Sequence, residues 1–276
     1  MSAPENTELF IEAGRAELHY WRDLWRFREL LGFLAWRDLK VRYKQTVLGA
    51  AWALIQPAVT LVVFTLVFGK LANMPAGGVP YPLLVLAGLL PWQLFANALS
   101  NSGGSLVSNT HLISKVYFPR LIVPLSSIAV ALADFAVVLV LYAVLATDFG
   151  LLPDWRLLLL PFYTVASLAA ALGAGLWLTA LTVRYRDFRF ILPFIIQVGV
   201  FLSPVGFITS NLPNWRLAYS LNPLVGIIDG FRWCLLRGKL PLYWPAQIIG
   251  LVMILVLLAT GVWFFRRTER SFADII

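Results

Sequence analysis

Long hydrophobic runs without charged residues divide this sequence, and six of them are long enough to cross a lipid bilayer. A transmembrane helix needs roughly 20 apolar residues, because each residue advances it by about 1.5 Å and the hydrocarbon layer is about 30 Å thick. The runs cover residues 45–69, 81–101, 121–147, 157–183, 190–209 and 246–265, with one aspartate inside the third. The pattern predicts an all-α membrane protein with six transmembrane helices and with both chain ends on one side.

A further apolar segment, residues 221–236, does not fit a seventh span. It contains a proline and two charged residues, and 16 residues are short for a crossing. We interpret residues 212–245 as short re-entrant helices on the outer face between spans 5 and 6, with Asn222 and Pro223 at the start of one helix. This interpretation places Arg232 on the outer side of the membrane.

Residues 24–43, before the first run, predict an amphipathic helix at the membrane interface. Apolar side chains recur there at the i, i+3, i+4 and i+7 spacing that lines one face of a helix. They are Phe27, Leu30, Leu31 and Leu34, and the rings suited to headgroup depth are Trp21, Trp25 and Trp36. The helix is either a membrane anchor alone or also a contact surface for a cytoplasmic partner.

The basic residues indicate which side of the membrane the chain ends face. Sixteen of the 22 lysines and arginines lie in the N-terminal segment, in two loops on the same side, and in the C-terminal tail. Loops with an excess of lysine and arginine stay in the cytoplasm. We expect a single domain, residues 1–276, with a cytoplasmic segment 1–46, a six-span bundle 47–265 and a cytoplasmic tail 266–276.

Composition agrees with a chain that lies mostly in lipid. Hydrophobic residues make up 60% of it and charged residues only 13%, against about a quarter in soluble domains. The net charge of +8 fits cytoplasmic loops and anionic headgroups, so it does not indicate nucleic acid as a partner. No cleavable signal peptide is expected, because the first 20 residues carry four glutamates and no apolar stretch.

The sequence lacks the motifs of a chain that works as an enzyme on its own. No Gly-x4-Gly-Lys-Ser/Thr loop is present to hold the phosphates of ATP, and no Gly-x-Ser-x-Gly nucleophile elbow occurs. The two histidines and the single cysteine form no cluster of metal-binding spacing. We therefore expect no catalytic residue, no metal site and no cofactor bound by this chain.

Asp134 is a carboxylate in the middle of a predicted span, 13 residues from each end of the third run. Placing a carboxylate at the centre of a span costs about 3 kcal/mol, and such residues often mark ion paths. No second acid lies inside the predicted spans, which favours a structural bond to a neighbouring helix over a proton relay. Normal, pH-independent transport by an Asp134→Asn variant would exclude the relay.

Aromatic side chains within the predicted spans are candidates for lining a path for a glycan, because their ring faces stack against the C–H faces of sugars. The candidates are Trp52, Phe64, Phe68, Trp92, Phe95 and Phe201, with Pro204 near the last of them. Contact with lipid is the alternative for each ring. Small residues in the fourth run, among them Gly173 and Gly175, permit close helix packing, either within one chain or between two copies.

Several short motifs follow one another in order along the chain. They are residues 42–52 (RYKQTVLGAAW) with Gln56-Pro57, Tyr81-Pro82 with 88–92 (GLLPW), 112–120 (LISKVYFPR), 184–187 (RYRD), Ser203-Pro204, and 221–224 (LNPL) with Arg232. The ordered set covers the chain from about Leu24 to its C-terminus. It resembles the membrane permeases of type-2 ABC exporters, which export O-antigen, capsule and teichoic-acid polymers.

The resemblance implies a homodimer of six-span subunits in the bacterial inner membrane, bound to two copies of a cytoplasmic ATP-binding subunit that holds ATP and Mg²⁺. The implied substrate is a lipid-linked glycan moved outward. Residues 109–119 resemble the coupling helix that contacts the ATPase, with apolar anchors and a rim charge as protein interfaces use. The coupling candidates are Leu112, Lys115, Val116, Tyr117, Phe118, Pro119, Arg120, Arg184, Arg186 and Asp187.

A basic band before the first span is a candidate for drawing in the lipid-pyrophosphate end of such a glycan. It consists of Arg37, Lys40, Arg42 and Lys44, and its alternative role is to orient the chain by positive charge. Two other functions remain open for the whole chain. One is the permease of an ABC-type drug or lipid exporter with the same fold, and the other is a proton-coupled carrier that uses Asp134.

Overall fold

The computed structural model describes residues 20–44, 49–185, 187–269 and 272, and the regular elements in this part of the chain are helices. In order they are α1 (Tyr20–Arg26), α2 (Arg28–Lys44), α3 (Gly49–Phe64), η2 (Thr65–Leu71), α4 (Tyr81–Ser108), α5 (Thr110–Lys115), α6 (Ile122–Asp148), η3 (Trp155–Leu159), α7 (Leu160–Arg184), α8 (Phe188–Gly199), η4 (Thr209–Asn211), α9 (Arg216–Tyr219), α10 (Pro223–Leu235) and α11 (Trp244–Glu269).

Five stretches of the described chain are helical, long enough and apolar enough to cross a membrane. They are Ala51–Leu71, Tyr81–Ser108, Ile122–Asp148, Trp155–Arg184 and Trp244–Glu269. The first four predicted runs and the sixth are therefore confirmed as helical within the described residues. The first four residues of the first run, 45–48, lie outside them.

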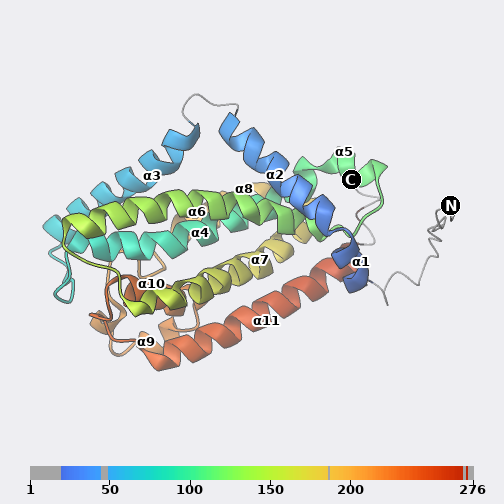
Figure 1. The fold of residues 1–276 in the computed structure, drawn as a ribbon. Helices are drawn as coiled ribbons and strands as arrows, with labels where there is room; N and C mark the ends of the chain where they lie inside the picture. The colour runs from blue at the N-terminus through green and yellow to red at the C-terminus, as the bar shows by residue number, and fades with distance from the viewer. Residues whose placement is uncertain (1–19, 45–48, 186, 270–271, 273–276) are drawn as a thin grey trace.

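α4 is the central helix of the bundle (Figure 1). It packs against α6 and α7, and α7 in turn packs against α11. In the apolar window of α4, 78% of the residues are buried, whereas the window that covers α3 and η2 is only 17% buried. α4 can be buried on most of its surface because it has no charged residue and many small ones, which let neighbouring helices pack closely. α3 lies at the edge of the bundle and exposes most of its apolar side chains.

The small residues of α7 allow its neighbours to approach closely. A Cβ atom on Gly173 would lie 2.8 Å from the backbone of Leu257 in α11, and one on Gly175 would lie 2.6 Å from Oγ of Ser102 in α4. Cβ atoms essentially never lie this close to a neighbour, so a larger side chain would require the α11 backbone to shift at Gly173 and the Ser102 side chain to move at Gly175. Packing within one chain, one of the two roles predicted for these residues, is confirmed.

The fifth predicted run is helical over only part of its length. α8 has 12 residues, which is about 18 Å of helix, and the chain then continues to residue 208 without regular helix. Pro204 supplies no N–H and Gly199 and Gly206 favour an open backbone, which explains why the helix stops. The segment still follows α4 along its length, with Trp92 packed on Gly199, and Gly88 beside Val205.

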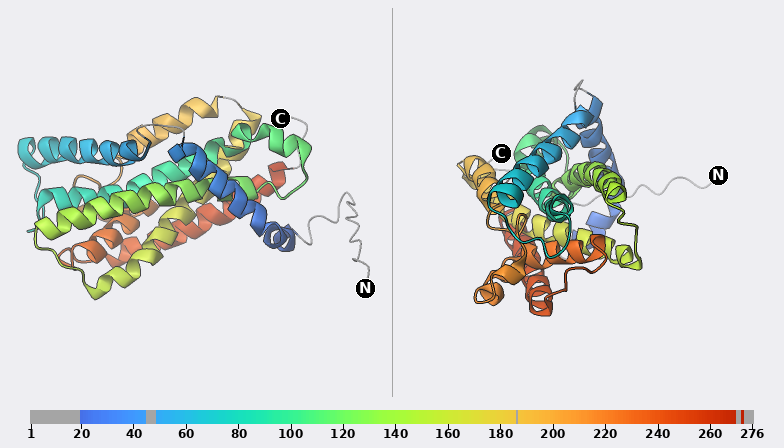
Figure 2. Two further views of the ribbon diagram at one scale, coloured as in Figure 1. Left: turned by 45° about the horizontal axis from the view of Figure 1, so that its top comes forward. Right: turned by 90° about the vertical axis from the view of Figure 1, so that its left-hand side faces the viewer.

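α1 and α2 cross the bundle obliquely at one end (Figure 2). α2 packs against α6, with Leu34 buried and Phe27, Leu30 and Leu31 packed around it. This confirms the predicted apolar face, although the helix is divided into α1 and α2 at Phe27. The rings of Trp21, Trp25 and Trp36 are exposed.

We name the two ends of the bundle by their short helices. The α5 end carries α1, α5 and the last turn of α11, and the α10 end carries α9 and α10 (Figure 1). At the α10 end, Asn222 caps α10 by accepting a hydrogen bond from the Leu224 N–H at 3.1 Å, which confirms the predicted helix start. Arg232 lies at this end but is fully buried between the helices.

Candidate functional site

The segment between α4 and α6 has an exposed tip and a buried base at the α5 end. Lys115, Val116 and Tyr117 form the tip, where the side chains of Val116 and Tyr117 are 50% and 57% exposed. Ile113 and Phe118 form the base and belong to the apolar cluster of this end. Among the predicted coupling residues of this segment, those of the tip are therefore the exposed ones that a partner protein can reach.

Phe118 differs from its predicted role as an apolar anchor for a partner. It is only 4% exposed and packs with Leu34, Phe265 and Phe272 in the cluster at the α5 end. The reason is the bend at Phe118-Pro119, which turns this ring inward while Tyr117 faces outward. A glutamate at this position would place a charge inside the cluster, so it would disturb folding of this end rather than a contact alone.

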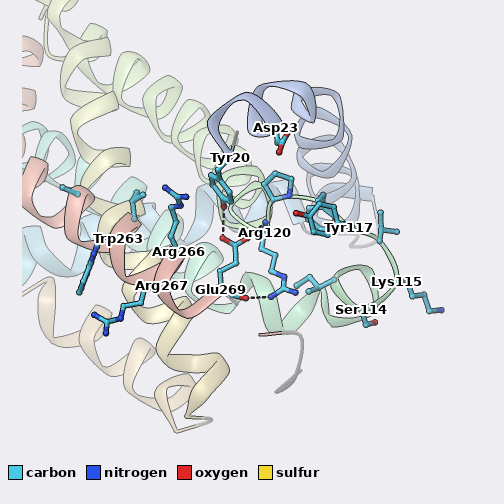
Figure 3. Close-up of a pocket in the computed structure, with 16 residues that line it drawn as sticks. Tyr20, Asp23, Ser114, Lys115, Tyr117, Arg120, Trp263, Arg266, Arg267 and Glu269 are labelled. Atoms are coloured by element: carbon cyan, nitrogen blue, oxygen red, sulfur yellow. Dashed lines mark hydrogen bonds between the residues drawn. The ribbon is translucent and has the colours of Figure 1, made fainter. Parts of the chain in front are cut away.

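The base of this segment is bound to the last turn of α11 through Glu269, which also binds α1 (Figure 3). One carboxylate oxygen, Oε2, accepts a hydrogen bond from the Tyr20 hydroxyl at 3.0 Å, and the other, Oε1, accepts one from the Arg120 backbone N–H at 2.9 Å. The Arg120 guanidinium donates to the Glu269 main-chain carbonyl. Burial and the adjacent Glu269 carboxylate raise the pKa of the Tyr20 hydroxyl, so it stays protonated as the donor.

A cleft of about 1090 Å³ opens beside this cluster. It is lined by α1, the tip and base of the α4–α6 segment, and the last turns of α11. Its basic side chains do not converge on one point: Arg266 lies 4.5 Å above the Tyr20 ring and Arg267 lies 5.4 Å from the Trp263 ring. The cleft therefore fits an inserted protein surface better than a single small anion.

The other predicted coupling residues lie in the turn between α7 and α8. Arg184 and Asp187 are exposed there, and Arg186 lies outside the described residues. Val183, next to Arg184, belongs to the same apolar cluster as Phe118, so this turn lies at the same end of the bundle. The two loops thus lie at the same end of the bundle.

The basic band of α2 is divided among different partners. Arg37 forms a salt bridge with Asp38 at 2.7 Å and donates to the Asn109 amide oxygen, also at 2.7 Å. Lys40 lies over the Trp36 ring, and Lys44 is exposed. Arg42 forms a salt bridge with Asp134 at 2.6 Å. The four residues thus do not gather around one anion site.

Asp134 is the centre of a polar cluster between α2 and the bundle. Besides Arg42, its carboxylate accepts a hydrogen bond from the Tyr43 hydroxyl at 2.7 Å, and the Asn97 amide lies 3.4 Å away. The Asp134 side chain is 5% exposed, whereas that of Arg42 is 42% exposed. The structural bond to a neighbouring helix that the sequence favoured is therefore present, and the neighbour is α2.

The predicted path residues fall into two aromatic groups against one segment. The ring centroid of Phe64 lies 5.3 Å from that of Phe68 and 6.2 Å from that of Phe201. The rings of Phe64 and Phe68 both pack against Gly206. Trp92 lies 5.9 Å from Phe95 and contacts Gly199. Both groups thus lie along residues 199–206. Trp52 lies apart from this arrangement, exposed in the first turn of α3, whereas Pro204 belongs to the segment itself and is buried.

Two residues with clear structural roles were missed by sequence reasoning. Glu269 joins α1, the α4–α6 segment and α11 at the α5 end. The only sign of it in the sequence is an acidic residue among the arginines that follow the last span. Arg232 donates hydrogen bonds to the backbone oxygens of Leu84, Val205 and Phe207 at 3.3, 2.8 and 2.8 Å. It was noted only as part of a motif, and nothing local indicated which carbonyls it binds.

A bundle with five helices long and apolar enough to cross a membrane is typical of a multi-span membrane protein. Residues 29–236 match the model of the family described as ABC-2 type transporter, which is about three-quarters of the chain. The chain belongs to this family.

Curated relatives align over most of their length. An O-antigen export system permease protein, RfbA, from Myxococcus xanthus is 28% identical over 260 residues, which are 92% of this chain and 98% of that protein. A protein of the same name from Klebsiella pneumoniae is 26% identical over 255 residues, 90% and 95% of the two chains. The polysialic acid transport protein KpsM of Escherichia coli is 24% identical over 210 residues, 73% and 79% of the two chains.

Proposed function

We propose that this chain is the membrane subunit of an ATP-driven exporter that moves a lipid-linked polysaccharide out of the cytoplasm. The observation that carries the proposal is the family match together with relatives named for O-antigen, polysialic acid and capsule export. The names describe export of O-antigen and of capsule polysaccharide, and transport of polysialic acid. The same proposal places the chain in a bacterial inner membrane.

The α5 end faces the cytoplasm in this proposal. Support comes from the distribution of basic residues, because α1, α2, the two loops at this end and the last turn of α11 carry most of the arginines of the chain. The segment 188–208 then provides the fifth of six crossings, as a short helix followed by open backbone, and α9 and α10 form the re-entrant region on the outer side. Open backbone at membrane depth requires burial in protein, and residues 203–206 are buried.

ATP-driven transport requires a separate motor, because the sequence has no phosphate-binding loop of its own. Two copies of an ATP-binding subunit, holding ATP and Mg²⁺, would contact the exposed tip Lys115–Tyr117 and the α7–α8 turn. A homodimer would enclose the path between its subunits. The exposed apolar side chains of α3, among them Trp52, Val59 and Val62, and those of α8 fit such an interface. Of the two aromatic groups, Phe201 is exposed enough to contact a sugar ring, whereas Phe64 and Trp92 are buried and support the segment beside it.

Tyr117 is exposed at the tip of the α4–α6 segment, where the ATP-binding subunit would make its contact. We expect a Tyr117→Glu variant to fold and insert normally but to lose at least about tenfold in export, because a charge in the centre of an apolar contact weakens binding by more than about 1.4 kcal/mol. The measurements are co-purification with the cognate ATP-binding subunit and the amount of host polysaccharide that reaches the cell surface. Leu152→Glu, an equally exposed position in the turn at the other end, is the matched control.

Two results would overturn the proposed function in polysaccharide export. If the purified chain binds no ATPase and instead moves protons in liposomes without ATP, the proton-coupled carrier is correct. If it binds an ATPase but deletion of its gene leaves surface polysaccharide unchanged, the substrate is a drug or lipid.

A further inference from the structure

The Glu269 cluster joins parts of the chain that are far apart in sequence. Tyr20 and Glu269 are separated by 249 positions, and Arg120 and Glu269 by 149. Through this one side chain, the base of the α4–α6 segment is hydrogen-bonded to α1 and to the last turn of α11 (Figure 3). Glu269 itself is only partly buried, so it lies at the edge of the apolar cluster rather than inside it.

The surroundings of the cluster leave little room for independent movement. Phe265 and Phe272 are fully buried beneath it, with ring centroids 5.5 Å apart, and the Arg120 guanidinium lies 6.0 Å above the Phe272 ring. Packed aromatic side chains resist compression because protein interiors are close-packed. A displacement of the segment's base is therefore transmitted to α11 rather than absorbed locally.

α11 is suited to carry such a displacement to the other end of the bundle. It is one continuous helix of 26 residues, or about 39 Å, and its proline is in the first turn, so no proline interrupts its interior. At the α10 end, the Gln247 amide donates to the Gly226 carbonyl of α10 at 2.9 Å. α10 in turn carries Arg232, which binds residues 205 and 207 of the open segment.

We propose that Glu269 is the positioning residue through which movement of the α4–α6 segment is passed to α11 and α1. The inference rests on the proposed function, since it takes the exposed tip of that segment as the contact of the ATPase. The tip makes the contact, and Glu269 converts its displacement into movement of the transmembrane helix. Without the Glu269 carboxylate, the ATPase still binds the tip and hydrolyses ATP. The displacement of the α4–α6 segment, however, no longer moves α11.

Two variants separate this role from simple stabilisation. Glu269→Ala removes both hydrogen bonds, whereas Glu269→Gln keeps an amide oxygen that can accept from the Arg120 N–H. In the full complex with its ATP-binding subunit, we expect Glu269→Ala to retain co-purification and at least half of the ATP hydrolysis but to export at least tenfold less host polysaccharide per ATP hydrolysed. Glu269→Gln should lie between the alanine variant and the wild type. Asp148→Ala, which removes an exposed carboxylate at the other end of the bundle, should match the wild type.

A distance measurement tests the mechanism directly. Spin labels at Ser114→Cys and Arg267→Cys report the separation of the two walls of the cleft, and the native Cys234 is buried and does not react under native conditions. In the wild-type complex this separation should be the same without ATP and after trapping with vanadate, because both walls move together. In the Glu269→Gln complex the trapped state should show a changed or broadened distance.

Several results would overturn the inference. Wild-type export per ATP hydrolysed in the alanine or glutamine variant would do so, as would an unchanged distance distribution in the glutamine variant. Equal losses of folded protein, hydrolysis and export would show a structural role only. Failure of the wild-type chain to bind any ATPase would instead refute the proposed function, which keeps the two failures distinct.

Discussion

Replacement of Arg232 by methionine is expected to abolish export and to destabilise the chain. The guanidinium is fully buried and binds three backbone oxygens, two of them in the open segment after α8. The oxygens of Val205 and Phe207 accept no hydrogen bond within a helix, because α8 ends at Gly199. Each buried acceptor left without a donor costs about 1–3 kcal/mol, so we expect a loss of at least about 3 kcal/mol, which is more than a hundredfold in the folded-to-unfolded ratio.

The measurements are the melting temperature of the purified chain in detergent and the amount of polysaccharide on the cell surface. Lys239→Met, an exposed basic position at the same end, is the matched control and should change neither. A second variant tests the same contact from the other side, because a Cβ atom on Gly88 would lie 2.9 Å from the Arg232 Nη2 atom. Gly88→Val should therefore resemble Arg232→Met. A normal melting temperature in both variants would refute this role of Arg232.

Loss of the Asp134 carboxylate is expected to loosen α2 from the bundle without creating any dependence of transport on a proton gradient. Asp134→Ala removes the partner of Arg42 and Tyr43, the two side chains that bind the C-terminal end of α2 to α6. Breaking a fully buried ion pair costs about 3–5 kcal/mol, and the 42% exposure of the Arg42 side chain lowers our expectation to about 1–3 kcal/mol. Asp134→Asn should have a smaller effect, because its amide oxygen can still accept from Tyr43.

A double-mutant cycle with Arg42→Gln measures the interaction itself, and we expect a coupling free energy of about 1–3 kcal/mol. Protease cleavage within residues 28–44 should become faster in Asp134→Ala, since α2 is held to the bundle in part by this cluster. Export by Asp134→Asn should keep the wild-type pH profile. A profile that shifts with this substitution would instead support proton transfer by Asp134.

Much of the fold follows from patterns that act over one helix at a time. The uncharged runs, the spacing of Phe27, Leu30, Leu31 and Leu34, and the Asn222-Pro223 helix start all predicted elements that the structure contains. Each depends on the local balance between apolar burial and backbone hydrogen bonding, and this balance is set by neighbouring residues. The fifth run was the exception. Its apolar residues predicted a continuous helix, but Gly199, Pro204 and Gly206 and the nearby Arg232 allow an open backbone instead.

The candidate site was predictable in position but not in detail. The segment 109–120 was recognised from its motif, yet nothing in the sequence distinguished the exposed Tyr117 from the buried Phe118, because the difference depends on one bend of the chain. Similarly, Arg37, Lys40, Arg42 and Lys44 form one basic band in sequence. In three dimensions they have different partners, and Arg42 binds an aspartate of the third span.

By itself, the sequence determined that this chain is a helical membrane protein, which face of α2 is apolar, and where its family motifs lie, because these depend on residue type and local spacing. Only the tertiary structure decided which charges meet. Arg232 finds carbonyls as far as 148 positions away, and Glu269 binds a tyrosine 249 positions away. A buried charge is tolerated only where its partner lies within hydrogen-bond distance, and that proximity is a property of the folded bundle rather than of any local pattern.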